Sequence, residues 1–391
     1  MRKLAVLLSL VALGAAAGTA HAQSRLPVPE LLRVASRLTG VTARSQPRVV
    51  VVSPAALRAR ALKQVMARYP AATQSYDTEL LRALGLLGAD QQLRPLLAQA
   101  WVRPRAPVLD ARTRTVYVAR GSDARGAALS GLVNALYADR YGLPAAPAGS
   151  SDEALALAAA AEGAAELAVR DLRTAQAAPT PSSPAAVFLG LEAQFVDALG
   201  LRLASNLLNV GGDRAVRGLL QRPPISTEQV LHVDKYLARE KPVAMELPAS
   251  PAGFSLVRDD TFGELDVRAL LAVFQVPRLD RVGSGWGGGL SAVYRDGSGH
   301  DSVALRLDWD TPLDAEEWAE AAAIYVNEAF DADTPGPPAE TPCAADACWS
   351  VGGRSIAFVR DGARTALVLD PGAPDVAASA SLARSLVGES A

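Results

Sequence analysis

The sequence predicts an α+β protein: a mostly α part with a small β-hairpin or sheet, followed by a smaller α+β part with an antiparallel sheet. Up to about residue 241, segments with apolar residues at helical spacing dominate the chain. From Pro242 onward, strand-like runs alternate with helices, which favours an antiparallel sheet. A chain with 50% hydrophobic and 20% charged residues is typical of a globular protein.

Residues 1–22 have the layout of a secretory signal peptide. Arg2 and Lys3 precede an apolar run from Leu4 to about Ala17, and Ala20-His21-Ala22 gives the small-residue cleavage pattern. The run is shorter than the ~20 residues that a membrane-spanning helix needs. We therefore expect an exported protein of a bacterial envelope, periplasmic or extracellular, with no integral membrane anchor after cleavage.

Helices are predicted throughout residues 23–241. Ser53 followed by Pro54 is a good helix start, and the helical spacing continues until Pro70 stops it. A β-hairpin is expected at 108–110 and 115–119. Further helices are predicted at 78–87, 124–141, 152–174 and 185–210, the last of them ended by Gly211-Gly212.

Residues 242–391 form the predicted second domain. Strands are expected at 290–295 and 302–309, then a helix at 315–330 and a proline-rich insert at 334–342. A second hairpin at 355–360 and 365–370 precedes a last helix at 374–387. Cys343 and Cys348 are the only cysteines, and in an exported protein such a pair is expected to form a disulfide.

Two observations argue against nucleotides and nucleic acid as partners. The stretch 283–288 matches G-x-G-x-x-G, but the residues after it have the pattern of a strand, where the dinucleotide motif requires a helix. We expect a glycine-rich turn around a packed Trp286 instead. The formal charge of −2 and the scattered basic residues provide no nucleic-acid-binding patch.

Histidine is scarce, since removal of His21 with the leader leaves only His232 and His300. Glu228 and His232 would lie one turn apart on a helix capped by Ser226, but no third metal ligand is in sight. The acidic residues between 308 and 317 are explained by the dipole of the helix that follows. No G-x-S-x-G motif supports a serine hydrolase. Carboxylates that are distant in sequence could converge for hydrolysis, but no particular pair is indicated.

Several stretches follow one another in a familiar order. They are a hairpin ending at 110–118, a helix with Ala135-Leu136 and Tyr141, Glu162-Gly163, the run Ser-Thr-Glu-Gln-Val-Leu-His at 226–232, Asp259-Asp260-Thr261, and the glycines of 285–288. This order resembles a family of exported prokaryotic zincin-like (HExxH metallopeptidase-like) surface proteins over roughly residues 105 to 310. The run at 226–232 is its most specific part.

The resemblance implies a degenerate member of that family. Its helix after the hairpin carries H-E-x-x-H, where two histidines bind zinc and the glutamate activates water. Ser130-Gly131-Leu132-Val133-Asn134 stands at that place here, so both histidines and the base are absent. Glu162 falls where the third ligand would lie, with Glu166 one turn further. We therefore expect no zinc, no other cofactor and no peptidase activity.

Three functions stay open from the sequence. The former cleft, lined by Ser130, Asn134 and Glu162, could bind a peptide or another exported protein. Alternatively, the chain is an exported hydrolase with an unrecognised carboxylate-based site, or an envelope scaffold without a cleft function. If the alignment is displaced, 124–141 is simply an amphipathic core helix.

Overall fold

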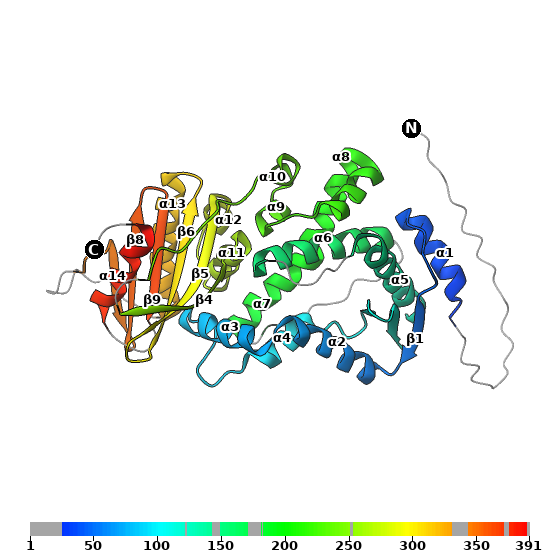
Figure 1. Ribbon diagram of the computed structural model, residues 1–391, viewed down its shortest axis with the longest axis horizontal. Coiled ribbons are helices and arrows are strands. Elements are labelled where there is room, and N and C mark those ends of the chain that lie inside the picture. The colour runs from blue at the N-terminus through cyan, green and yellow to red at the C-terminus, as the bar shows by residue number, and fades with distance from the viewer. Residues whose placement is uncertain are drawn as a thin grey trace.

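The structure is a computed structural model that describes residues 26–121, 123–142, 149–170, 181, 183–250, 253–330, 343–370 and 375–388. It is elongated, with a six-stranded sheet at one end, a three-stranded sheet at the other and helices between them (Figure 1). Its fold class is the predicted one, α+β with a helical first part and an antiparallel sheet in the second. The expected leader at 1–22 and the proline-rich insert at 334–342 lie outside the described residues.

All neighbouring strands of the large sheet are antiparallel, in the order β4-β5-β6-β9-β8-β7. Both predicted hairpins are confirmed, and β9 of the second hairpin pairs with β6 of the first. The two edge strands, β4 and β7, were not predicted because they lack a sustained apolar run. The strands are β4 (Phe254–Thr261), β5 (Trp286–Asp296), β6 (Asp301–Trp309), β7 (Ala347–Val351), β8 (Arg354–Asp361) and β9 (Arg364–Asp370).

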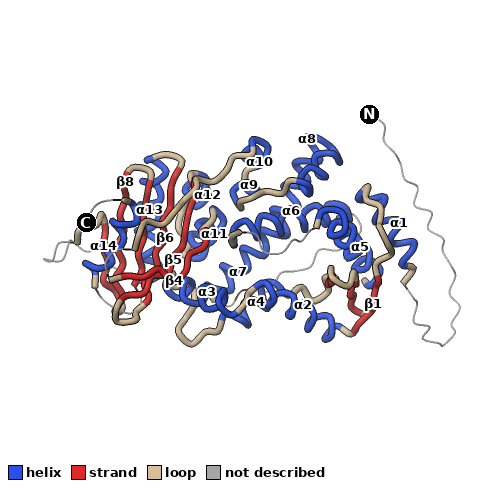
Figure 2. Tube along the Cα trace, in the orientation of Figure 1, coloured by secondary structure: helices blue, strands red, loops and turns tan. Residues whose placement is uncertain are grey.

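Alternation along the strands gives this sheet two buried faces. On β9, Leu367 and Leu369 join the cluster that contains α13 (Pro312–Phe330). Ala366 and Val368 of the same strand join the cluster that contains α14 (Val376–Val387). Successive residues of a strand point to opposite faces, so the part forms three layers, helix, sheet and helix (Figure 2).

The first part is built from helices, and the short sheet lies at its far end (Figures 1 and 2). Within that sheet, β2 (Val108–Asp110) and β3 (Thr115–Ala119) form the predicted hairpin, and β1 (Arg48–Val52), which was not predicted, pairs in parallel with β3. The helices of this part are α1 (Val28–Thr39), α2 (Pro54–Arg68), α3 (Ala71–Ala83), α4 (Leu93–Trp101), α5 (Ala124–Tyr141), α6 (Ser151–Val169), α7 (Pro184–Gln194), α8 (Gly200–Gln221), α9 (Thr227–Leu231) and α10 (Val233–Ala238).

The predicted helix at 185–210 is longer and less regular than expected. It consists of α7, a π-helical turn at Phe195–Leu199, and α8. Gly212, with φ 60° and ψ −161°, kinks the chain, which then continues as helix to Gln221 instead of ending there.

The combined segment Pro184–Gln221 is long and apolar enough to cross a membrane by length and composition, since it contains an 18-residue window of mean hydropathy 1.3. A core helix passes the same test. Phe188 and Leu189 of α7 and Leu203 of α8 belong to hydrophobic clusters with neighbouring elements. Part of the segment is therefore packed in the core of the described chain.

The largest hydrophobic cluster joins the two predicted parts. It includes Leu84, Leu97 and Phe188 from the helical part together with residues of the sheet, α11 (Glu264–Val273) and α13. The division of the chain into two domains at residues 241 and 242 stays a prediction. The two predicted parts contact each other through the apolar side chains of this cluster.

The predicted disulfide is confirmed. Cys343 and Cys348 are bonded, with a Cα–Cα distance of 6.4 Å, which is within the usual range for such a bond. The loop that they close leads directly into β7.

Candidate functional site

The residues singled out by the zincin-like resemblance lie on the neighbouring helices α5 and α6. Ser130 is buried, at 3% exposure, whereas Asn134, Glu162 and Glu166 are half-buried. Two of the cavities in the described parts of the chain have volumes of ≈330 and ≈150 Å³, and neither of these two is lined by the four residues. No group of three or more His, Cys, Asp or Glu side chains suited to a metal ion occurs among the described residues.

Gly131 has a packing role in this arrangement. A Cβ atom at this position would lie 2.2 Å from Val116 Cγ1 and 3.0 Å from Pro107 Cβ. Helix α5 therefore packs directly onto β3 and the segment before β2, and a glutamate side chain does not fit there. The degenerate-site interpretation stays a prediction, and the sheet fills the space next to Gly131, the position that the resemblance assigns to the base.

Glu228 and His232 do not form a common site. Glu228 Oε1 lies 2.6 Å from Lys235 Nζ, and His232 Nε2 lies 2.9 Å from Glu264 Oε1. The hydrogen bond with Glu264 raises the pKa of His232. The predicted cap is present, since Ser226 Oγ accepts from the Gln229 amide at 3.3 Å. Ser226, Glu228 and His232 thus each have a partner within the protein.

The glycine-rich stretch 283–288 runs from the end of α12 (Leu279–Ser284) into β5. This is the reverse of the strand-to-helix order of a dinucleotide site. Trp286 is 0% exposed, and its indole Nε1 donates to the Phe262 carbonyl at 3.1 Å. As expected, the glycines surround a packed tryptophan.

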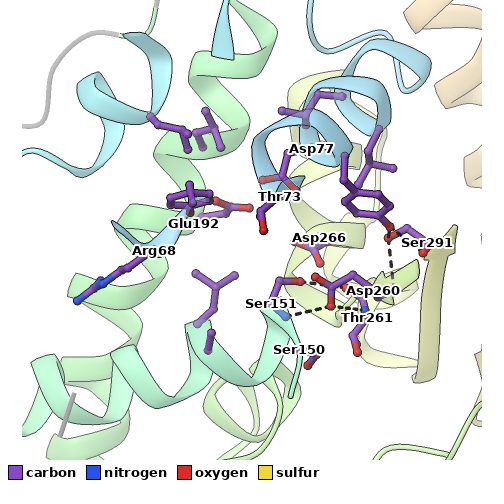
Figure 3. Close-up of a pocket in the computed structure, with 18 of the residues that line it drawn as sticks. Arg68, Thr73, Asp77, Ser150, Ser151, Glu192, Asp260, Thr261, Asp266 and Ser291 are labelled. Atoms are coloured by element: carbon purple, nitrogen blue, oxygen red, sulfur yellow. Dashed lines mark hydrogen bonds between the residues drawn. The ribbon is translucent and has the colours of Figure 1, made fainter. Parts of the chain in front are cut away.

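The larger cavity, of ≈330 Å³, lies between α3, α4, α6 and α7 on one side and β4 and α11 on the other (Figure 3). It is thus at the boundary of the two predicted parts. Its size falls in the ~300–1,000 Å³ range of small-molecule pockets. Its inner wall is apolar and includes Leu81, Leu84, Leu93, Leu97, Phe188 and Leu189.

Three carboxyl groups from three separate helices line this cavity: Asp77 of α3, Glu192 of α7 and Asp266 of α11 (Figure 3). Asp266 is 8% exposed; its Oδ2 accepts from the Gly263 amide at 2.8 Å. The other oxygen, Oδ1, has no partner in the described chain. Asp77 and Glu192 form no hydrogen bond or ion pair with any described residue. The cavity therefore has an apolar wall and a polar end whose acids lack partners.

Burial makes these acids hard to ionise. It raises the pKa of Asp77 to about 7, with a further upward effect of Asp260 and an opposing one of Arg258. Burial, with the neighbouring charge of Asp152, raises the pKa of Asp266 to about 8. The pKa of Glu192 is also raised well above its usual value, by burial and then by Asp266 and Asp77. Burial is the largest cause for each group, and the charge of Asp77 further disfavours the ionised forms of Asp266 and Glu192.

The rim of the cavity is held by hydrogen bonds. Asp260 Oδ1 accepts from the Ser151 amide at 3.1 Å and from the Thr261 amide at 2.8 Å. The Tyr76 hydroxyl donates to the Ser291 carbonyl at 2.7 Å. These contacts tie α3 and the start of α6 to the large sheet, so the polar end is a preformed structure.

Sequence reasoning did not find this site. It noted that distant carboxylates could converge, but it had no means to choose among them. One signal was present: Glu192 is the only charged residue of α7, whose sequence is otherwise apolar apart from Gln194. Glutamate is rarely found inside a protein unless it is paired, and Glu192 is half-buried.

Comparison with known proteins adds one match. A domain of unknown function (DUF8575) matches residues 254–380, less than half of the chain. This segment contains β4, which contributes Asp260, and α11, which contributes Asp266. No curated protein and no solved structure shows significant similarity to the chain.

Proposed function

We propose that this protein binds a small organic molecule in the cavity between its helical part and its large sheet. The observation that carries the proposal is the convergence of Asp77, Glu192 and Asp266 in an apolar cavity where Asp77 and Glu192 have no partner among the described residues. Burying a carboxyl group without a partner costs free energy. Such groups concentrate in binding and catalytic pockets.

The proposal places the ligand away from the former cleft suggested by the zincin-like resemblance. Ser130, Asn134 and Glu162 line neither the ≈330 Å³ nor the ≈150 Å³ cavity of the described chain, and Gly131 packs against Val116. Binding of a peptide or an exported protein there has no comparable support. From the layout of residues 1–22 we infer export, so that the ligand is met outside the cytoplasm.

A second candidate function uses the same residues. Because the pKa of Asp77 is about 7 and that of Asp266 about 8, the pair could serve as proton donor and acceptor near neutral pH. This corresponds to the carboxylate-based hydrolase left open by the sequence. Mass spectrometry of the bound ligand after incubation distinguishes the two functions, since only the hydrolase changes the ligand's mass.

The binding proposal is tested by filling the cavity. Ala158 of α6 lines it, and Ala158→Phe places an aromatic ring in the space that a ligand would occupy. The matched control is Ala59→Phe, at an exposed position of α2 that does not line the cavity. The probe is N-phenyl-1-naphthylamine, a neutral apolar dye whose fluorescence rises on transfer out of water.

We expect saturable one-to-one dye binding to the wild type and to Ala59→Phe, and an affinity lower by about tenfold or more in Ala158→Phe. Circular dichroism verifies that both variants are folded. Equal binding by Ala158→Phe and the wild type would contradict the proposal, and so would the absence of saturable binding to the folded wild type.

A further inference from the structure

The polar end of the cavity has more acidic than basic groups. Four carboxyl groups line it, those of Asp77, Glu192, Asp260 and Asp266, and Asp152 lies close enough to raise the pKa of Asp266. The cations among the described lining residues are Arg68 and Arg258.

Neither arginine is paired with the inner acids, although Arg258 opposes the rise in the pKa of Asp77. Arg258 lies over the Tyr76 ring, 5.1 Å from its centroid, and donates to Thr73 Oγ1 at 3.4 Å. Arg68 is exposed. In the described structure, no ion pair joins either arginine to Asp77 or Glu192. A cation that enters the cavity would therefore find unused acceptors.

We infer that the ligand is an organic amine in its protonated form with an apolar body. Its ammonium group would be held between Asp77 and Glu192, which are directed into the same space in Figure 3. The apolar body would pack against the wall formed by Leu84, Leu97 and Phe188. This inference rests on the proposed ligand-binding function and adds the chemical class of the ligand.

Charge complementarity favours an amine over other ligands of the same size. A carboxylate or phosphate would face Asp77, Glu192 and Asp266 and be repelled by each of them once ionised. A neutral alcohol could use these groups only as ordinary hydrogen-bond partners. Hydrogen bonds in which the donor or the acceptor is charged are about twice as strong as neutral ones, and an ammonium group adds direct attraction to an ionised carboxylate.

Binding of an ammonium group should release protons, because it stabilises the ionised form of acids that burial keeps protonated. Affinity for an amine should consequently increase with pH. The charged and titratable groups that face the three acids are Arg68, Tyr69, Tyr76, Asp152, Arg258 and Asp260. Their net charge is close to zero, so they do not replace the missing counter-ion.

The test uses three probes with one body and different head groups: 4-phenylbutylamine, 4-phenyl-1-butanol and 4-phenylbutyrate. Calorimetry measures their affinities for the purified protein at about pH 8 and about pH 5.5. At the higher pH we expect the amine to bind about tenfold or more tightly than the alcohol, and the carboxylate to bind most weakly. At the lower pH the amine should lose this advantage.

Variants then locate the head group. Asp77→Asn with Glu192→Gln should reduce amine affinity by about tenfold or more and change alcohol affinity by no more than about twofold. Asp213→Asn, at an exposed position of α8, is the matched control. The comparison of the wild-type protein with three probes does not depend on the variants being folded.

Two failures are distinguishable. Equal affinity for the amine and the alcohol at about pH 8, or an amine affinity that the double variant leaves unchanged, would overturn the amine inference and leave ligand binding intact. Failure of all three probes and of the naphthylamine dye would overturn the binding function itself.

Discussion

Asp152 of α6 accepts hydrogen bonds from both the backbone amide and the hydroxyl of Thr227, the first residue of α9. The same hydroxyl accepts from the Leu265 amide of α11 at 3.2 Å. One threonine thus joins three helices behind the polar end of the cavity. Burial raises the pKa of Asp152 to about 6, against the effect of these bonds.

Replacing this hydroxyl should destabilise the protein. Thr227→Val removes the hydroxyl that donates to Asp152 and leaves the Leu265 amide without its buried acceptor, while the backbone amide of residue 227 still donates to Asp152. We therefore expect the free energy of unfolding to fall by about 1–3 kcal/mol. Thr227→Ser keeps the hydroxyl and should retain most of the stability. Urea denaturation measures both, and equal stability of the valine and serine variants would contradict the proposed link.

Gly131→Ala should also destabilise the protein, although alanine favours helix. Its methyl group would lie 2.2 Å from Val116 Cγ1, and such overpacking costs about 1–3 kcal/mol. The matched control is Gly190→Ala in α7, where nothing lies within 4 Å of the added atom. That change should increase stability by about 0.5–1 kcal/mol. Opposite shifts in melting temperature are expected, and a stabilised Gly131→Ala would show that α5 does not pack as described.

The buried acids predict a pH dependence of stability. The pKa of Asp77 is about 7 and that of Asp266 about 8 when folded, against ordinary values of 3.8, so the folded state binds more protons in between. The contribution of Asp77 and Asp266 to the free energy of unfolding should therefore be fully present below about pH 4. It should decrease as the pH rises from about 4 to about 8.

Asp77→Asn should reduce this decrease, since an amide cannot ionise. Denaturation at about pH 5 and about pH 8 measures the difference for the wild type, for this variant and for the exposed control Asp213→Asn. We expect Asp77→Asn to be less sensitive to pH than the wild type and Asp213→Asn to match the wild type. A wild-type protein that becomes more stable over this range would be at odds with the buried acids.

The disulfide should make a modest contribution. It closes a loop with a sequence separation of 5, and the chain-entropy relation gives about 2 kcal/mol for so short a loop. Reduction, or replacement of Cys343 and Cys348 by serine, should lower the free energy of unfolding by no more than about this amount. A loss of the folded state on reduction would show that β7 depends on the bond far more than its edge position suggests.

The sequence predicted elements that have local signals and missed those that depend on distant partners. Ser53 and Pro54 start α2 as expected, with Ser53 Oγ accepting from the Ala56 amide at 3.2 Å. In contrast, β1 is a short valine run that forms a strand because β3 lies beside it. Gly212 interrupts the helix with a non-helical conformation, as its glycine predicts, but a second helical stretch follows it directly to Gln221, which the sequence did not indicate.

The candidate site was missed for the same physical reason. Asp77, Glu192 and Asp266 lie on three helices that are far apart in sequence and that meet only because the hydrophobic cluster joins α3, α7 and α11. Spacing within one helix cannot reveal such a meeting. Gly131 is the opposite case. The resemblance to zincin-like proteins interprets this glycine as a replaced catalytic glutamate, but the close approach of Val116 is enough to explain why the position is a glycine.

The most direct test of a ligand site in the cavity is a crystal structure with 4-(4-bromophenyl)butylamine, because bromine is located by its anomalous scattering. We predict an anomalous peak among Leu84, Leu97 and Phe188, with the amine beside Asp77 and Glu192. A bromine peak elsewhere on the protein, with this cavity empty in the same crystal, would contradict the proposed site.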